Sequence, residues 1–124
     1  MKMVRFLTAI LVLAILASSA EASNTVTLTS GYPKAGCSSG TIFVDGTYSL
    51  DSGWSLVGTG FTIYVWQDGL EVTTVSAAGF FGSFSQTISS LNSSVTYNVF
   101  VEMTITNGCD TIIIATLPAT VTTN

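Results

Sequence analysis

Residues 61–76, FTIYVWQDGLEVTTVS, have the sequence pattern of a β-hairpin, and this stretch decides the fold class. Aromatic and β-branched residues fill 61–67, Asp68-Gly69 follows, and 70–76 supplies a second run rich in valine and threonine. Asp-Gly is a strong signal for a two-residue turn, because both positions of a type I′ turn need positive φ. The stretch therefore predicts a central strand, a tight turn and an antiparallel partner strand.

The rest of the chain after residue 22 shows the same period-two pattern and no sustained helical spacing. Residues 31–40 read as a loop, Asp45-Gly46 as a turn, and 77–82 as a loose segment rich in small residues and phenylalanine. Asn107-Gly108 is a second hairpin signal, and Pro118 limits the last strand to an edge. About seven strands at short spacing predict an all-β sandwich or barrel. Besides the hairpin, strands are expected at 25–29, 41–44, 84–88, 96–106 and 111–117.

The first 22 residues have the layout of a secretory signal peptide. Lys2 and Arg5 precede a run, 6–17, that is apolar except for one threonine, and small residues follow at 18–22. That run is well short of the ~20 residues that span a bilayer. We therefore expect a signal-peptide helix at 1–22 and one mature domain at 23–124, exported to the cell surface or beyond, with no membrane span after cleavage.

The charge of the expected mature chain excludes several classes of partner. Lys34 is its only cation and faces six carboxylates, a net charge of −5. Nucleic acid is excluded as a partner because phosphate binding depends on lysine and arginine. The same shortage argues against binding to an anionic membrane surface.

The chain contains no histidine, which removes the commonest general base and the commonest metal ligand. A Ser-His-Asp triad is therefore impossible. The aspartates at 45, 51 and 68 fall in turn-like segments, where local hydrogen bonding favours them, and they form no recognisable calcium loop. We expect a protein that is not an enzyme and needs no cofactor or metal.

Several motifs together resemble a family of bacterial surface domains. Leu91 followed by Tyr97 resembles the tyrosine corner of immunoglobulin-like sandwiches. The segments 37–44 (CSSGTIFV), 64–69 (YVWQDG) and 97–109 (ending in Asn-Gly-Cys) occur in the order seen in Ig-like, PKD-like and SprB-type repeats. The resemblance covers about residues 37–117, and 45–60 is longer than the usual gap. It implies an immunoglobulin-like Greek-key β-sandwich of about seven strands, with Trp66 as its core tryptophan.

Cys37 and Cys109 are the only cysteines. In an oxidising compartment two cysteines most often pair with each other, so an internal disulfide is favoured. In a regular sandwich of this type, however, the entry to the second strand and the last hairpin lie at opposite ends. Two Cα atoms must come within about 7 Å to be bridged. The alternative is that the two cysteines link subunits.

The strand at 61–67 is apolar on both faces, whereas a half-exposed sandwich strand should be apolar on one. A loop around 77–81 could cover the second face. Otherwise the surplus aromatic face forms a subunit interface or a platform on which sugar rings stack. The candidate residues for such a surface are Trp54, Tyr64, Trp66, Phe80, Phe81 and Phe100.

The first strand, at 25–29, also has two interpretations. It is the first strand of its own domain, or a donor strand that inserts Val26 and Leu28 into a neighbouring subunit by β-augmentation. The function expected from all these features is a secreted, non-enzymatic structural or adhesive surface protein that associates with itself as a filament or surface-layer subunit. The alternative is a secreted carbohydrate-binding module that recognises surface glycans through tryptophan and tyrosine.

Overall fold

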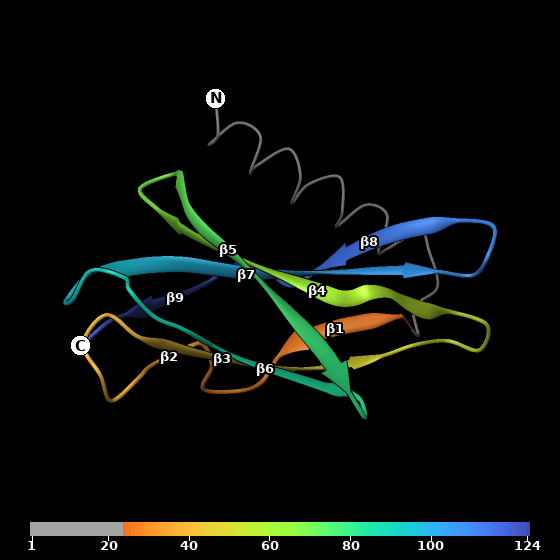
Figure 1. The fold of residues 1–124 in the computed structure, drawn as a ribbon, viewed down its shortest axis with the longest axis horizontal. Coiled ribbons are helices and arrows are strands. Elements are labelled where there is room, and N and C mark those ends of the chain that lie inside the picture. Colours follow the sequence, from red (N-terminus) through yellow and green to blue (C-terminus); the bar gives the residue numbers. More distant parts are fainter. Residues whose placement is uncertain (1–23) are drawn as a thin grey trace.

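The computed structural model describes residues 24–124, and every regular element in that range is a strand. The expected signal peptide lies outside the described residues. Two antiparallel sheets pack face to face as a sandwich, seen as the two layers of Figure 1. The strands are β1 (Thr25–Leu28), β2 (Lys34–Ala35), β3 (Ile42–Ser49), β4 (Ser55–Gln67), β5 (Leu70–Phe80), β6 (Ser83–Ile88), β7 (Thr96–Thr106), β8 (Thr111–Ala115) and β9 (Ala119–Thr122).

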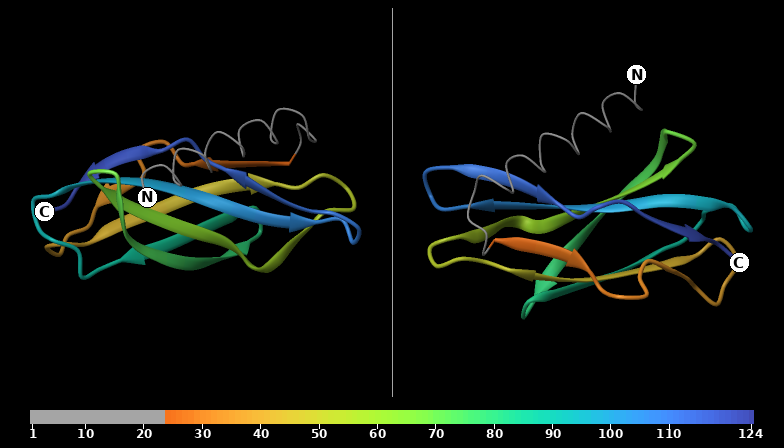
Figure 2. Two further views of the ribbon diagram at one scale, coloured as in Figure 1. Left: turned by 90° about the horizontal axis from the view of Figure 1, so that it is seen from above. Right: turned by 180° about the vertical axis from the view of Figure 1, so that it is seen from behind.

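Strand β5 joins the two sheets. Its first part pairs with β4, up to the pair Gly60 and Ala78, and its last two residues pair with β6. Sheet A therefore contains β1, β2, β3, β6 and the end of β5, whereas sheet B contains the rest of β5 with β4, β7, β8 and β9. Figures 1 and 2 show β5 crossing diagonally from one layer to the other. The expected loose segment at 77–82 is thus mostly strand.

The core lies between the sheets and is built from alternating inward side chains, as period-two sequences require. On β4 the inward residues are Phe61, Ile63 and Val65, each at most 1% exposed. The ring of Phe61 stacks on that of Phe84 from sheet A, with centroids 4.5 Å apart. The fully buried large side chains are Tyr97, Phe61, Phe100, Ile42, Ile63, Met103, Ile105, Val44, Val65, Val99 and Val101.

The local hairpin prediction is confirmed. Gln67 pairs with Leu70, and Asp68 and Gly69 both have positive φ, at 51° and 78°. The strand expected at 96–106 also has these bounds in the structure.

The turn expected at Asp45-Gly46 is wrong, because both residues lie inside β3. A Cβ at Gly46 would come within 2.2 Å of Cζ of Phe84 and 2.7 Å of the Thr27 carbonyl oxygen. Glycine at this position therefore serves to let a phenyl ring cross the strand, and no chain reversal occurs.

The described residues form nine strands, more than the expected seven, for two reasons. The loop expected at 31–40 contains the two-residue β2, which pairs with Phe43 and Ile42. The chain after Pro118 also returns to β7 as β9, which pairs along 96–99. In addition, Gly58-Thr59-Gly60 does not interrupt β4 but lies at a bulge within this long strand, since the pairing with β7 shifts between Leu56 and Phe61.

Candidate functional site

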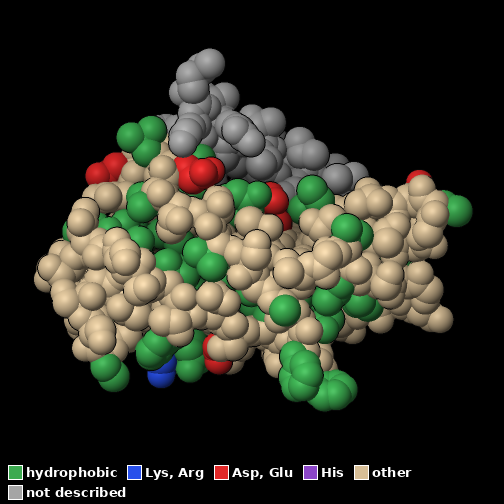
Figure 3. Space-filling view, in the orientation of Figure 1, with side chains coloured by type: hydrophobic (Ala, Val, Ile, Leu, Met, Phe, Trp, Pro, Cys, Tyr) green, Lys and Arg blue, Asp and Glu red, His purple; other side chains and the backbone are tan. Residues whose placement is uncertain are grey.

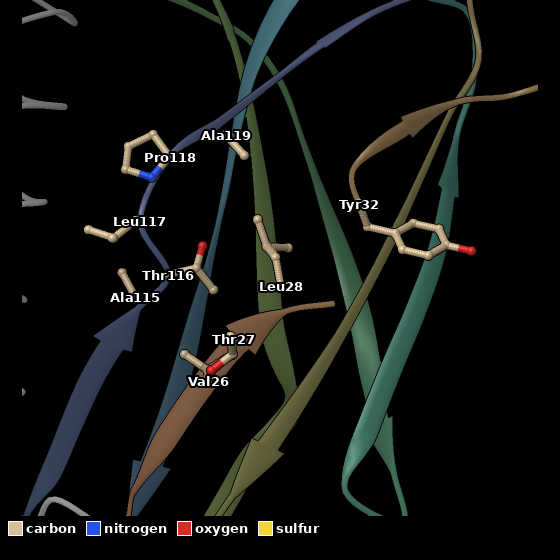
Figure 4. A pocket seen from close by; sticks show the side chains of 9 residues that line it. All are labelled: Val26, Thr27, Leu28, Tyr32, Ala115, Thr116, Leu117, Pro118 and Ala119. Atoms are coloured by element: carbon tan, nitrogen blue, oxygen red, sulfur yellow. The ribbon is translucent and has the colours of Figure 1, made fainter. Parts of the chain in front are cut away.

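An apolar groove opens where the two sheets meet along one side of the sandwich. It is lined by residues 26–28 of β1, by Tyr32 and by residues 115–119, which link β8 to β9. We call it the seam groove; its volume is about 410 Å³. Figure 4 shows the side chain of Leu28 directed into the space between Tyr32 and the β8–β9 link. None of the lining residues is charged.

A one-residue bulge shapes one wall of this groove. Ala115 pairs with Glu102 and Ala119 with Val99, so four steps along the link match three along β7. Thr116 holds the bulge: its amide donates to the Val101 carbonyl at 2.9 Å, and its hydroxyl accepts the Val101 amide at 3.0 Å. An extra residue in an edge strand re-aims its neighbours. Leu117 is accordingly turned outward and is 80% exposed.

A second apolar feature is the turn between β5 and β6. Phe80 is 71% exposed and Phe81 is 92% exposed, with ring centroids 4.4 Å apart. We call this pair the aromatic tip. Hydrophobic side chains protrude from the lower edge of the molecule at this turn (Figure 3, in the orientation of Figure 1). Of the two interpretations of the second face of β4, the structure does not show the covering loop around 77–81, because Phe80 and Phe81 point into solvent.

The backbone at the aromatic tip is strained. Phe80 pairs with Ser83, which leaves Phe81-Gly82 as a two-residue turn with φ values of 51° and 83°. Positive φ in a bulky residue is an outlier, and Asn, Asp or Gly is the usual choice at the first position of such a turn. The same chain uses Asp68, also at φ 51°, in the equivalent position of the β4–β5 turn.

The other aromatic candidates do not form an open platform. Tyr64 and Trp66 lie on the outer face of β4 with Phe100, opposite to the inward residues, and the rings of Tyr64 and Phe100 stack at 4.7 Å. Trp66 is 4% exposed and Phe100 is 2% exposed. Trp66 is therefore buried but lies outside the cluster between the sheets, so the core role implied by the resemblance is wrong. Trp54 is half-buried against that cluster.

The expected internal disulfide is absent from the structure. Cys37 and Cys109 are both free and exposed. The loop that contains Cys37 lies near the Thr96 end of β7, because it is bonded to Asn124, which follows the strand β9 that pairs with Thr96. Cys109 follows Thr106, at the other end of β7. The 11 residues of β7 separate these ends by about 30 Å. The two loops lie at opposite ends of the sandwich in Figures 1 and 2, far beyond the reach of a bridge.

The first strand belongs to its own domain in the structure. Val26 pairs with Tyr48 and Leu28 with Gly46 of β3. The side chain of Val26 is 8% exposed and joins the core cluster, and Leu28 packs against it. Of the two interpretations of this strand, the structure shows the ordinary first strand.

The carboxylates within 24–124 do not gather, and three of them, Asp45, Asp51 and Glu102, accept hydrogen bonds from nearby groups. Asp45 accepts the Ser85 hydroxyl at 2.6 Å, and Glu102 accepts the Tyr64 hydroxyl at 2.9 Å. No group of three or more His, Cys, Asp or Glu side chains in this range is arranged to hold a metal ion. In the same range, no helix has the length and apolar character needed to cross a membrane.

Comparison with known proteins supports the fold alone. No protein-family model matches the chain, and no curated protein matches it in sequence. The crystal structure of an engineered protein from the Northeast Structural Genomics Consortium is similar, with a TM-score of 0.57 and 21% identity. The similarity covers 85% of this chain and 21% of that protein, so this chain spans about a fifth of its length. The sensor domain of the anti-sigma factor RsgI4 from Pseudobacteroides cellulosolvens aligns at a TM-score of 0.42 and 17% identity, over 75% of this chain and 91% of that domain.

Sequence reasoning found the aromatic tip but missed the seam groove. The groove joins Tyr32 to residues 115–119, which are far apart in the chain. Pro118 was the single local signal, since it marks an edge where pairing is interrupted. The bulge beside it could not be predicted without the register of residues 115–119 against β7.

Proposed function

We propose that this chain is an exported, non-enzymatic structural or adhesive protein of the cell surface that associates with copies of itself. The observation that carries the proposal is the aromatic tip, where two phenyl rings are presented to solvent in a strained turn. Backbone strain of this kind persists where the surrounding structure imposes it, and it clusters at functional positions. An aromatic pair that contributes nothing to the core of its own domain fits a contact with another molecule.

The surface chemistry supports association through apolar contacts. No charged residue occurs between Glu71 and Glu102 or after Asp110. These segments supply the aromatic tip and most of the seam groove. Charged residues are depleted at the centres of protein interfaces, because burying them requires desolvation.

We also infer that the sandwich is of the immunoglobulin-like Greek-key type. The strand order β1-β3-β6-β5-β4-β7-β8 supports this inference, since β4 and β7 are central in one sheet and β3 and β6 pair in the other. The Tyr97 hydroxyl, which accepts the amide of Asn92 at 2.9 Å, is a second support. A buried tyrosine bonded to backbone a few residues upstream is a hallmark of these domains.

The carbohydrate-binding alternative has weaker support. The two exposed aromatic residues at the tip are phenylalanines, and no exposed tryptophan accompanies them.

The association is tested by size-exclusion chromatography with light scattering and by negative-stain microscopy of the secreted protein over a range of concentrations. We expect oligomers or filaments that grow with concentration, and N-terminal sequencing that begins at Ser23 or Glu21. A compact monomer at the highest concentration reached would contradict self-association. Binding to a glycan array that is lost in Trp54→Ala or Trp66→Ala would favour the alternative instead.

A further inference from the structure

The molecule carries one protruding apolar feature and one concave apolar feature, at different places on its surface. The aromatic tip closes β5 and β6, and the amide of Tyr48 donates to the Gly82 carbonyl at 2.9 Å, which fixes the tip beside β3. The seam groove lies on the far side of β1, which is paired with β3. Strands β1 and β3 thus separate the two features, so a copy can offer both at once.

The size of the seam groove suits the aromatic tip. An apolar cavity of about 150 Å³ is enough to bind one benzene ring. At about 410 Å³, the seam groove has room for the two rings of the tip. Its lining is aliphatic except for Tyr32 and the two threonines, and it holds no charge that docking would desolvate.

The conformation of Phe81 is an independent observation that points to an occupant for its ring. Asp68 occupies the same φ of 51° in the neighbouring hairpin, as turn chemistry favours. At the second hairpin the chain places an aromatic residue where it is locally unfavourable, and leaves it 92% exposed. Selection for the stability of the lone domain does not account for this choice, whereas a binding role for the ring does.

We infer that the aromatic tip of one copy docks in the seam groove of the next copy. This inference rests on the self-association proposed above and names its two surfaces. Tip and groove are different patches, so the contact is heterologous: it leaves a free groove on one partner and a free tip on the other. Contacts of this kind build open chains when the rotation does not close a ring.

Two variants separate the surfaces. Phe81→Asn removes the outer ring and leaves the groove intact, in a turn that accepts asparagine. Leu117→Asp places a charge at the groove wall, at a side chain already 80% exposed, and leaves the tip intact. The matched controls are Asp68→Asn, at the same φ in the other hairpin, and Leu70→Asp, at a leucine that is 59% exposed. Circular dichroism establishes that all four variants are folded.

The test is sedimentation of each purified protein alone and of a mixture of the two interface variants. We expect each interface variant to weaken association by about thirtyfold or more, the loss typical of a hot-spot side chain, while both controls assemble as the wild type does. The mixture should form heterodimers that grow no further, because only one productive tip and groove pair remains.

Four results would overturn the inference in distinguishable ways. A wild-type monomer would remove both the inference and the proposed function. An assembling wild type whose interface variants also assemble would remove the inference alone. Failure of the mixture to form heterodimers would indicate a symmetric contact. If a monomeric wild type binds phosphatidylcholine vesicles and Phe81→Asn does not, the tip would be assigned to a lipid surface.

Discussion

Replacing Phe81 by asparagine should make the domain more stable, although it deletes a large hydrophobic side chain. A non-glycine residue in the left-handed region costs about 1–2 kcal/mol, and asparagine relieves part of that cost by local hydrogen bonding. The ring is 92% exposed, so its removal gives up little burial. Its contact with Phe80, at 4.4 Å between centroids, lies at the lower end of the range of about 0.5–1.5 kcal/mol for aromatic pairs.

The balance is a gain of about 0.5–1 kcal/mol in the free energy of unfolding. For a domain of this size, 1 kcal/mol shifts the thermal midpoint by about 4–8 °C. Calorimetry of Phe81→Asn should therefore show a midpoint raised by about 2–8 °C, measured at a concentration where the wild type is dissociated. Asp68→Asn is the control, because it exchanges two residues that both suit the conformation.

A fall in the midpoint of Phe81→Asn would refute the reasoning, because it would show that the ring stabilises its own domain. An unchanged midpoint in both variants would show that the positive φ of Phe81 carries no appreciable strain. If Phe81→Asn both raises the thermal midpoint and loses association, the effect of the ring on stability is separated from its effect on assembly, because the two change in opposite directions in one variant.

Three further perturbations probe the fold. Gly46→Ala should destabilise the domain by about 1–3 kcal/mol, because its Cβ would overlap the Phe84 ring at 2.2 Å. Urea denaturation measures the loss, and a variant as stable as the wild type would contradict the packing described. Thr116→Val should lower the free energy of unfolding by about 1–3 kcal/mol, because it leaves the buried amide of Val101 without its acceptor. An unchanged free energy in the same assay would show that the bulge does not need the hydroxyl. Cys37→Ser and Cys109→Ser should each leave the free energy of unfolding within about 0.5 kcal/mol of the wild-type value. A maleimide should label both thiols of the folded wild-type chain, and protection of either thiol would argue against the free, exposed state.

Local signals predicted the hairpins well because a hairpin is decided by a few adjacent residues. Asp68-Gly69 adopts the expected positive φ values, and β7 has the expected bounds. The same reasoning failed at Asp45-Gly46, where an identical dipeptide lies mid-strand. The difference is a tertiary contact, the Phe84 ring against Gly46, which a local pattern does not contain.

The candidate site was predictable only in part for the same reason. Exposed aromatic rings at Phe80 and Phe81 follow from their place in a turn-like segment. Alternation identified two apolar faces on β4 but could not decide which of them is turned toward the core, because period two is symmetric between faces. The pairing of Cys37 with Cys109 depended on distance across the whole sandwich, which composition and compartment do not provide.

The position of the two ends of the described chain has a mechanical consequence. Asn24 is held at the β3–β4 loop, where its side-chain oxygen accepts the Asp51 amide at 2.7 Å, and Asn124 is held at the opposite end by the Gly40 amide at 3.1 Å. A pull applied between residues 24 and 124 therefore runs parallel to the strands. Such a load drives β1 along β3 and β9 along β7 in shear, so the hydrogen bonds of each ladder share the force together. Under this load the domain would yield by sudden rupture of whole strands, and gradual unzipping from one end would not occur.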